Sequence, residues 1–120
     1  MKRSLLFLFA FVLLGFSTSA LAQDAKQDFT LVNATGVEIN EVHITPHDAD
    51  EWGEDVLGRD VLQNDEECDI QFHPQEDVCS WDIRIADKEG NAIEWESIDL
   101  CKWTKITLKY DGQTATAEFE

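Results

Sequence analysis

The sequence has few basic residues, few cysteines and only one long apolar stretch. Nine Lys and Arg stand against 25 Asp and Glu, and the formal net charge is −16 at pH 7. A surface this acidic repels phosphate backbones, which excludes a nucleic-acid-binding protein, and it also disfavours anionic membrane surfaces. Only three cysteines are present and none forms a Cys-x-x-Cys pair, so a thioredoxin-like redox role has no support.

The one long apolar stretch lies near the N-terminus. Lys2 and Arg3 precede the apolar residues 5–16, and the small residues that follow end in Ala20-Leu21-Ala22. This order is typical of a secretory signal peptide, so we expect residues 1–22 to be cleaved and residues 23–120 to form one domain in the periplasm or outside the cell. No later run approaches the roughly 20 apolar residues that span a bilayer. No cysteine stands directly after the cleavage site, where a lipid would be attached, so we expect no anchor in the mature chain.

Charge becomes more one-sided in the expected mature chain. All 25 acidic residues lie beyond residue 22, whereas two of the nine basic residues precede it, so residues 23–120 carry a net charge of −18. Most of this charge is expected to form a solvated surface. Such a field favours a protein partner of basic character or a small cationic partner.

Apolar and polar residues alternate over most of residues 23–120, which indicates β-strands. Turn signals separate the alternating segments, notably Asn33-Ala34-Thr35-Gly36, residues 87–91 and Asp111-Gly112. Seven short strands in about 100 residues predict an all-β protein, an antiparallel β-sandwich. The strands are expected within residues 29–31, 37–44, 68–72, 81–85, 93–95, 106–110 and 115–119.

One segment breaks the alternation. Between Thr45 and Gly58, Trp52 and Val56 are four residues apart and Leu57 follows, which is helical spacing. Acidic residues precede them, where the positive end of a helix dipole would lie, and Gly58 is a typical C-terminal stop. We therefore predict one short helix that closes an end of the sandwich.

Several motifs occur together in one order: Asn33-Ala34-Thr35-Gly36, Thr45-Pro46, Trp52-Gly53, Leu57-Gly58, Cys79 followed by Trp81-Asp82, and Asp99-Leu100-Cys101. In this the chain resembles a family of small secreted bacterial β-sandwich proteins of uncharacterised function. Some relatives carry the label argininosuccinate lyase, which names a helical enzyme several times longer. The signature loop of that enzyme is not present here, so the label does not apply. The resemblance implies the fold and supplies no catalytic residue.

Three cysteines in an exported chain predict one disulfide and one remaining thiol. If the turn at 87–91 centres near Glu89, Ile83 faces Trp95 and Cys79 lies within one diagonal step of Cys101. We therefore predict a Cys79–Cys101 disulfide that closes the open end of this hairpin. The alternative pair, Cys68–Cys79, would be several residues out of step. Cys68 shares a face with Ile70, which predicts a buried thiol.

The acidic loop 48–55 is the strongest candidate for a metal site. Asp48, Asp50 and Asp55 offer hard oxygen ligands suited to Ca²⁺. The EF-hand pattern fails, since Trp52 takes a ligand position and Arg59 stands where the final Glu should be. Any calcium site would be irregular, and the alternative is a solvated acidic segment. No other cofactor is expected.

Catalytic residues are not indicated. No Gly-x-Ser-x-Gly motif occurs, and the few serines are expected near no obvious base. His43 and His47 are four apart, which would pair two metal ligands on a helix, but His43 alternates with Val42 and Ile44 and is expected in a strand. We read the histidines as exposed and unrelated, and we expect no enzyme activity.

Trp103 lies between strands with Lys102 and Lys105, beside the only basic cluster. An exposed Trp flanked by Lys on so acidic a protein would suit a contact surface. Alternatively, Trp103 covers the end of the sandwich. Taken together, the sequence favours a non-catalytic binding or structural module, with irregular cation binding by residues 48–55 as the alternative and an enzyme as a distant third.

Overall fold

The computed structural model describes residues 24–120, so the predicted signal peptide, residues 1–22, lies outside the described residues. Within this range no helix is long and apolar enough to cross a membrane. Seven strands follow one another: β1 (Phe29–Ala34), β2 (Glu41–Pro46), β3 (Glu67–Ile70), β4 (Ser80–Ala86), β5 (Ala92–Asp99), β6 (Lys105–Tyr110) and β7 (Ala115–Phe119). The prediction of seven strands is confirmed.

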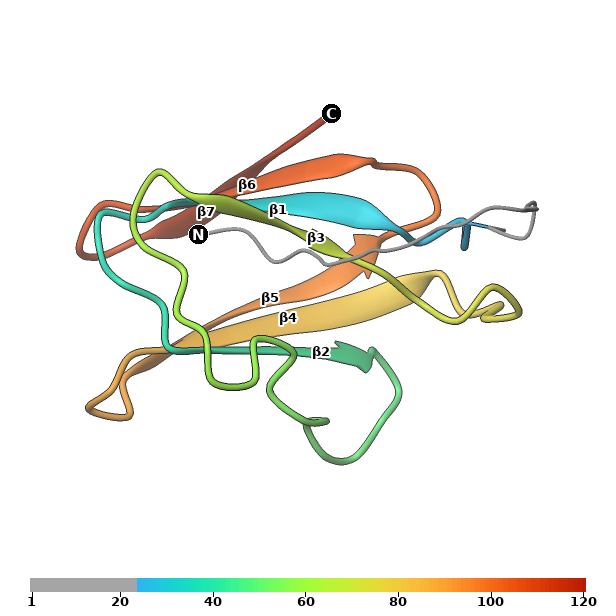
Figure 1. The fold of residues 1–120 in the computed structure, drawn as a ribbon, viewed down its shortest axis with the longest axis horizontal. Helices are drawn as coiled ribbons and strands as arrows, with labels where there is room; N and C mark the ends of the chain where they lie inside the picture. The colour runs from blue at the N-terminus through green and yellow to red at the C-terminus, as the bar shows by residue number, and fades with distance from the viewer. Residues whose placement is uncertain (1–23) are drawn as a thin grey trace, which may run out of the picture.

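The strands form two stacked sheets (Figure 1), with the order β3-β1-β6-β7 in one and β2-β4-β5 in the other. The sandwich is not wholly antiparallel as predicted, because β1 and β6 run parallel. The chain leaves the first sheet after β1 and returns to it on both sides of β1, as β3 and then as β6. Alternation of apolar residues reports which face of a strand is buried and carries no information on its direction, so the parallel pair could not be read from the pattern.

The core lies between the sheets and is built from the alternating residues. Both sheets contribute fully buried side chains: Leu31, Ile106 and Leu108 come from the first sheet and Ile83 from the second. The side chains of Trp81 and Trp95 are also buried, as the alternation predicted. Burial of one face of each strand against the other sheet is what the period-two pattern encodes.

The β4–β5 hairpin has the predicted register over its inner half. Ile83 pairs with Trp95 and Ile85 with Ile93. Nearer the open end the register shifts by one residue between Trp81 and Ile83, and Ser97 on β5 has a positive φ of 59°. Such a bulge places two residues of β5 opposite one residue of β4.

The predicted disulfide is confirmed. Cys79 and Cys101 are bonded, with their Cα atoms 5.2 Å apart, at the open end of the β4–β5 hairpin. Cys68 is buried on β3 and is not part of a disulfide. The bulge shifts the pairing by one residue without moving the cysteines out of reach of each other.

The helix predicted between Thr45 and Gly58 is wrong. Strand β2 continues to Pro46, and the chain then folds back so that Asp55 forms a bridge with His43. The backbone N–H of Val56 donates to the Val42 carbonyl at 2.7 Å. Pairing with β2 satisfies the loop backbone and covers the edge of that sheet, which a single isolated helical turn would leave open.

Candidate functional site

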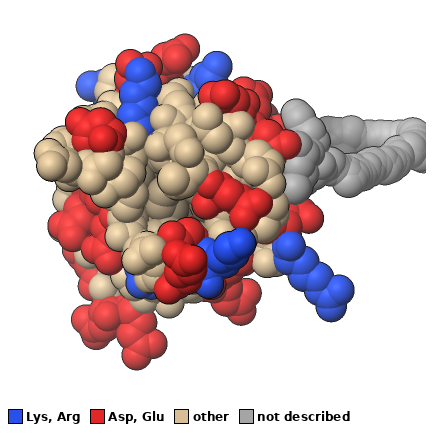
Figure 2. Space-filling view, turned by 90° about the vertical axis from the view of Figure 1, so that its left-hand side faces the viewer, with Lys and Arg blue, Asp and Glu red and all other residues tan. Residues whose placement is uncertain are grey.

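A hollow lined mainly by apolar residues lies at one end of the sandwich, and we call it the end cavity. It has a volume of about 390 Å³ and lies where the β1–β2 connection, the β4–β5 hairpin and the end of β6 meet. Figure 2 faces this end and shows uncharged side chains around a hollow, with acidic side chains and a few basic ones at the margin. The apolar lining comes from Val37, Ile39, Ile85, Ala86, Ala92 and Ile93.

Three turns build the end cavity, and the sequence marks each of them. Gly36 precedes Val37 and has a φ of +88°, a backbone conformation that favours glycine. In the hairpin turn Asp87 accepts hydrogen bonds from the backbone N–H groups of Glu89 and Asn91. The Asn91 side chain donates to Asp87 as well, and these hydrogen bonds hold the pKa of Asp87 below its ordinary value. The carboxylate of Asp87 therefore shapes the turn and stays charged at neutral pH.

Glu38 is the second carboxylate at the end cavity. Its Oε2 accepts a 2.7 Å hydrogen bond from the Gln63 amide, and its Oε1 accepts a longer one, 3.4 Å, from Asn40. A carboxylate can accept about four hydrogen bonds. Two neutral amides thus fix the position of Glu38 and leave it acceptor capacity for a ligand.

Tyr110, at the end of β6, completes the wall. Its hydroxyl donates to the carbonyl of Gly112 at 2.9 Å, in the turn that leads to β7. Since the hydroxyl is engaged in this turn, the aromatic ring is the part of Tyr110 that can contact a ligand. The end cavity therefore combines apolar walls, one ring and two carboxylates.

The predicted contact surface forms a compact aromatic and basic group. Lys102 Nζ lies 4.9 Å from the centroid of the Trp103 ring, and that ring lies 5.4 Å from the ring of Phe119. Trp103 is partly buried and packs against the core, while Phe119 is 37% exposed. Lys105 exchanges backbone hydrogen bonds with Glu120. Trp103 thus covers part of the sandwich and still offers an aromatic surface, so its role in contacts stays a prediction.

The predicted calcium ligands do not converge. Asp55 Oδ1 accepts hydrogen bonds from the backbone N–H groups of Val42 and Leu57, at 2.9 and 3.0 Å, so this carboxylate joins the loop to β2. Asp48 and Asp50 are exposed. Asp50 lines a small hollow of about 190 Å³ together with four further carboxylates, those of Glu51, Asp82, Glu94 and Glu96.

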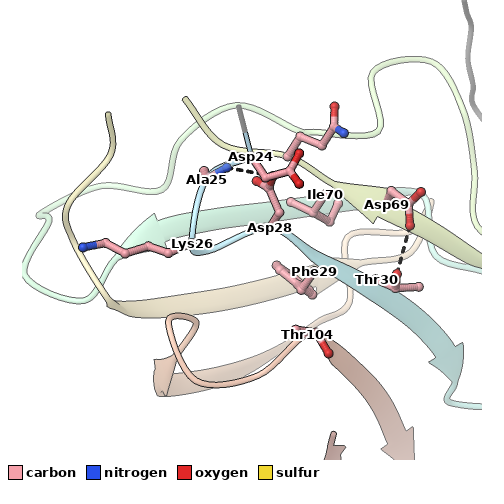
Figure 3. Close-up of a pocket in the computed structure, with 10 residues that line it drawn as sticks. Asp24, Ala25, Lys26, Asp28, Phe29, Thr30, Asp69, Ile70 and Thr104 are labelled. Carbon is pink, nitrogen blue, oxygen red and sulfur yellow. Dashed lines mark hydrogen bonds between the residues drawn. The ribbon is translucent and has the colours of Figure 1, made fainter. Parts of the chain in front are cut away.

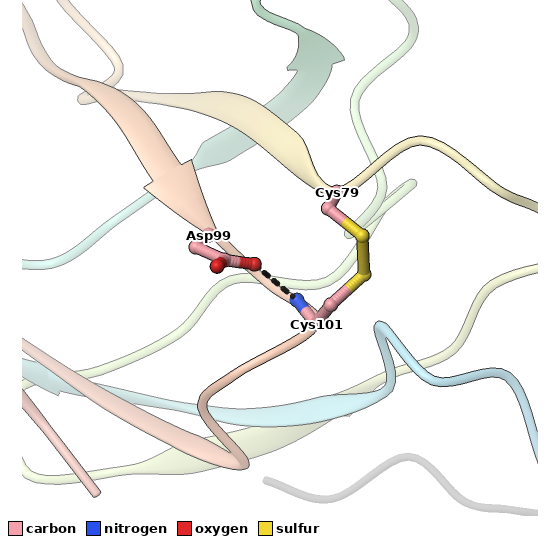
Figure 4. Close-up of side chains that lie close together, drawn as sticks. All are labelled: Cys79, Asp99 and Cys101. Carbon is pink, nitrogen blue, oxygen red and sulfur yellow. Dashed lines mark hydrogen bonds between the residues drawn. A yellow bond between two sulfur atoms is a disulfide. The ribbon is translucent and has the colours of Figure 1, made fainter.

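Among residues 24–120, one group of three ligand-type side chains has its ligand atoms within 4.8 Å of one another: Cys79, Asp99 and Cys101 (Figure 4). Its two sulfur atoms are bonded to each other. Asp99 accepts a hydrogen bond from the backbone N–H of Cys101 at 3.0 Å. These contacts form a local turn around the disulfide, and neither sulfur is a thiolate that could bind a metal.

One arrangement contradicts the expectation that no serine lies near a base. His47 Nδ1 lies 2.9 Å from Asp82 Oδ1, and the bulge residue Ser97 brings its hydroxyl to 3.3 Å from His47 Nε2. Sequence reasoning missed this because the three residues come from the end of β2, β4 and the β5 bulge. The hydrogen bond with Asp82 and its negative charge raise the pKa of His47.

In this structure the Ser97 hydroxyl is not aligned to give its proton to His47. Ser97 Oγ lies 3.4 Å from His47 Nδ1, nearly the same distance as from Nε2. An oxygen in the plane of the imidazole ring at these distances from both nitrogens would collide with a ring carbon. The Ser97 hydroxyl therefore lies over the ring face, away from the nitrogen lone pair that could accept its proton. Ser97 and His47 are also exposed to water.

A third hollow, of about 370 Å³, lies where β1 begins and β3 ends (Figure 3). The polar side chains of Asp28, Thr30 and Asp69 are engaged within the chain. Asp28 accepts hydrogen bonds from the backbone N–H groups of Ala25 and Phe72, and Thr30 donates to Asp69. These bonds hold the N-terminal segment to the sheet and give Asp28 and Asp69 a structural role.

Comparison with known proteins supports the fold alone. No family model matches the chain, and no curated protein matches its sequence. A protein from Eubacterium rectale, solved by NMR, has a similar structure, with a TM-score of 0.57 and 13% sequence identity. The match covers 86% of this chain and 94% of that one.

Proposed function

We propose that the chain is an exported, non-catalytic binding module whose ligand site is the end cavity. The observation that carries this proposal is a hollow of about 390 Å³, lined mainly by apolar residues, with two fixed carboxylates. Ligand sites commonly have this size and this mixture of many apolar and few polar groups. They also lie on the loops of a rigid scaffold, as this cavity does.

Export is supported by two features of the chain. The N-terminal segment has the order of a signal peptide, and the Cys79–Cys101 disulfide is typical of an oxidising compartment. The resemblance to small secreted bacterial β-sandwich proteins supports the same location. We therefore place the working protein in the periplasm or outside the cell, without a membrane anchor in residues 23–120.

NMR shift mapping on the exported protein tests the site. We expect small neutral aromatic compounds such as 2-phenylethanol to shift, saturably, the amide signals around Val37, Ile93 and Tyr110. Ala92→Trp places a bulky ring at the cavity, on an exposed residue, and should abolish these shifts. Ala49→Trp, at another exposed alanine outside the cavity, is the control and should leave them unchanged. Shifts that map elsewhere, or no saturable shifts, would overturn the proposal.

Cation binding by residues 48–55 is the second candidate function. The observation that favours it is the acidic hollow that Asp50 shares with Glu51, Asp82, Glu94 and Glu96. Ca²⁺ takes six to eight oxygen ligands, and these side chains could approach one another around an ion. Its test is the comparison of Ca²⁺ with NaCl described below.

A further inference from the structure

The two carboxylates at the end cavity take part in no ion pair among the described residues. The ion pairs among residues 24–120 join Arg84 to Glu94, Lys109 to Glu118, and His43 and His47 to Glu41 and Asp82. None of these pairs involves Glu38 or Asp87. The side chains that fix Glu38 are the amides of Gln63 and Asn40, which carry no charge. Two carboxylates therefore lie at the rim of an apolar hollow without an ion pair among the described residues.

The whole molecule reinforces this local field. Residues 23–120 carry a net charge of −18, and acidic side chains surround the end cavity in Figure 2. A concave site with low-dielectric walls concentrates such a field and raises the local concentration of ligands of opposite charge. An anionic ligand would be repelled, and a neutral ligand would leave the two carboxylates uncompensated.

The walls define the rest of the ligand. Ile39 and Ile85 are buried, whereas Val37 is 46% exposed and Ile93 is partly exposed at the cavity. Contact with Val37 and Ile93 removes apolar surface from water and favours a hydrocarbon group. The ring of Tyr110 adds a surface that attracts cations as well as apolar groups.

We propose that the end cavity binds an organic cation, a protonated amine carried on an aromatic or aliphatic body. The amine would lie against the Glu38 carboxylate, and the hydrocarbon would pack between Val37, Ile93 and Tyr110. This inference rests on the proposed function, since it names the ligand class of the same site.

The test compares three ligands that share one body and differ in charge: 2-phenylethylamine, 2-phenylethanol and 3-phenylpropionate. Affinities are measured by NMR titration of the exported protein at neutral pH in 0.15 M NaCl, which limits the screening length to about 8 Å. We expect the amine to bind about tenfold more tightly than the alcohol, because hydrogen bonds to charged groups are roughly twice as strong as neutral ones. The carboxylate should show no saturable shifts.

Two pairs of variants separate the cavity from the general field of the protein. Glu38→Gln should remove the preference for the amine, whereas Asp77→Asn removes one charge from the β3–β4 connection and should preserve it. Ala92→Lys places a fixed cation at the cavity without touching the hydrogen bonds of Glu38. It should weaken binding of the amine about tenfold and leave binding of the alcohol unchanged. The control Ala49→Lys should leave both affinities unchanged.

Each failure has its own meaning. Equal affinities for the amine and the alcohol, or a preference that Glu38→Gln and Ala92→Lys leave intact, would overturn the cationic ligand while the binding module stands. If none of the three compounds gives saturable shifts at the cavity, both proposals fail.

Discussion

At the scale of single residues, His43 has contacts that depend on pH. Its Nε2 lies 2.9 Å from a Glu41 oxygen and its Nδ1 lies 2.8 Å from the Gly53 carbonyl. Both neighbours are acceptors, so both nitrogens are satisfied only when each carries a proton and the ring is charged. Burial lowers the pKa of His43, but the hydrogen bonds and the charges of Glu41 and Asp55 outweigh it, and the pKa is raised above its ordinary value.

A raised pKa gives the pH dependence a definite sign. His43 should stabilise the fold fully below its ordinary pKa of 6.5 and lose this contribution as pH rises through the higher value in the folded protein. His43→Gln removes the titration, so the free energy of unfolding of the wild type minus that of the variant should fall as pH rises above about 6.5. Urea unfolding of both proteins at a series of pH values measures this difference. The contribution of His47 cancels in the difference, and a difference that grows with pH would contradict the assignment.

Asp55 was predicted as a metal ligand, and its contacts indicate a structural role instead. Its Oδ1 accepts two backbone hydrogen bonds, one of them from the buried residue Val42. Asp55→Ala should therefore lower the free energy of unfolding by about 1–3 kcal/mol in buffer containing EDTA. Asp55→Asn keeps an acceptor oxygen and should cost less. If neither variant changes stability without Ca²⁺, the loop is not held to β2 by this side chain.

At the scale of elements, the β4–β5 hairpin is the part that the sequence predicted best. The turn residues 87–91 and the alternation of Ile83, Ile85, Ile93 and Trp95 are local, and together they determine the register and the cysteine pair. The bulge at Ser97 was not predicted, since nothing in the local pattern marks a serine for positive φ. The helix prediction failed for the opposite reason, because local spacing favoured it and pairing with β2 overrode it.

The disulfide gives the element-scale prediction. Cys79 and Cys101 are 22 residues apart. Closing a loop of this length restricts the unfolded chain and contributes about 3 kcal/mol in the chain-entropy model. The double variant Cys79→Ala, Cys101→Ala should lose about this free energy of unfolding. Reduced wild type should match the reduced double variant, and peptide mapping under non-reducing conditions should link residues 79 and 101.

At the scale of the whole molecule, the end cavity could not be predicted from the sequence, although the turns that form it could. The three turn signals around Gly36, residues 87–91 and Asp111-Gly112 are plain in the sequence, and each was interpreted correctly as a turn. That they meet at one end follows from the strand order and from the parallel pair β1–β6. No motif in the sequence marks Glu38 or Tyr110, and it is this topology that places them around one hollow.

Net charge dominates the behaviour of the molecule in solution. The −18 charges of residues 23–120 repel one another more strongly in the compact folded state than in the expanded chain. The Debye length is about 30 Å at 0.01 M salt, so repulsion acts across the whole domain, and about 3 Å at 1 M, so most of it is removed. The melting temperature should therefore rise with NaCl, and a fall would contradict the electrostatic argument.

This salt dependence is the baseline for testing calcium. Ca²⁺ that binds the folded state adds a saturable stabilisation by mass action, beyond what ionic strength produces. Since the carboxylates of Asp48, Asp50 and Asp55 do not converge, we expect millimolar Ca²⁺ to raise the melting temperature no more than NaCl of matched ionic strength. A saturable increment that Asp48→Asn or Asp50→Asn abolishes would instead make cation binding the leading function. Asp77→Asn, which lowers the net charge equally outside the loop, should leave such an increment in place.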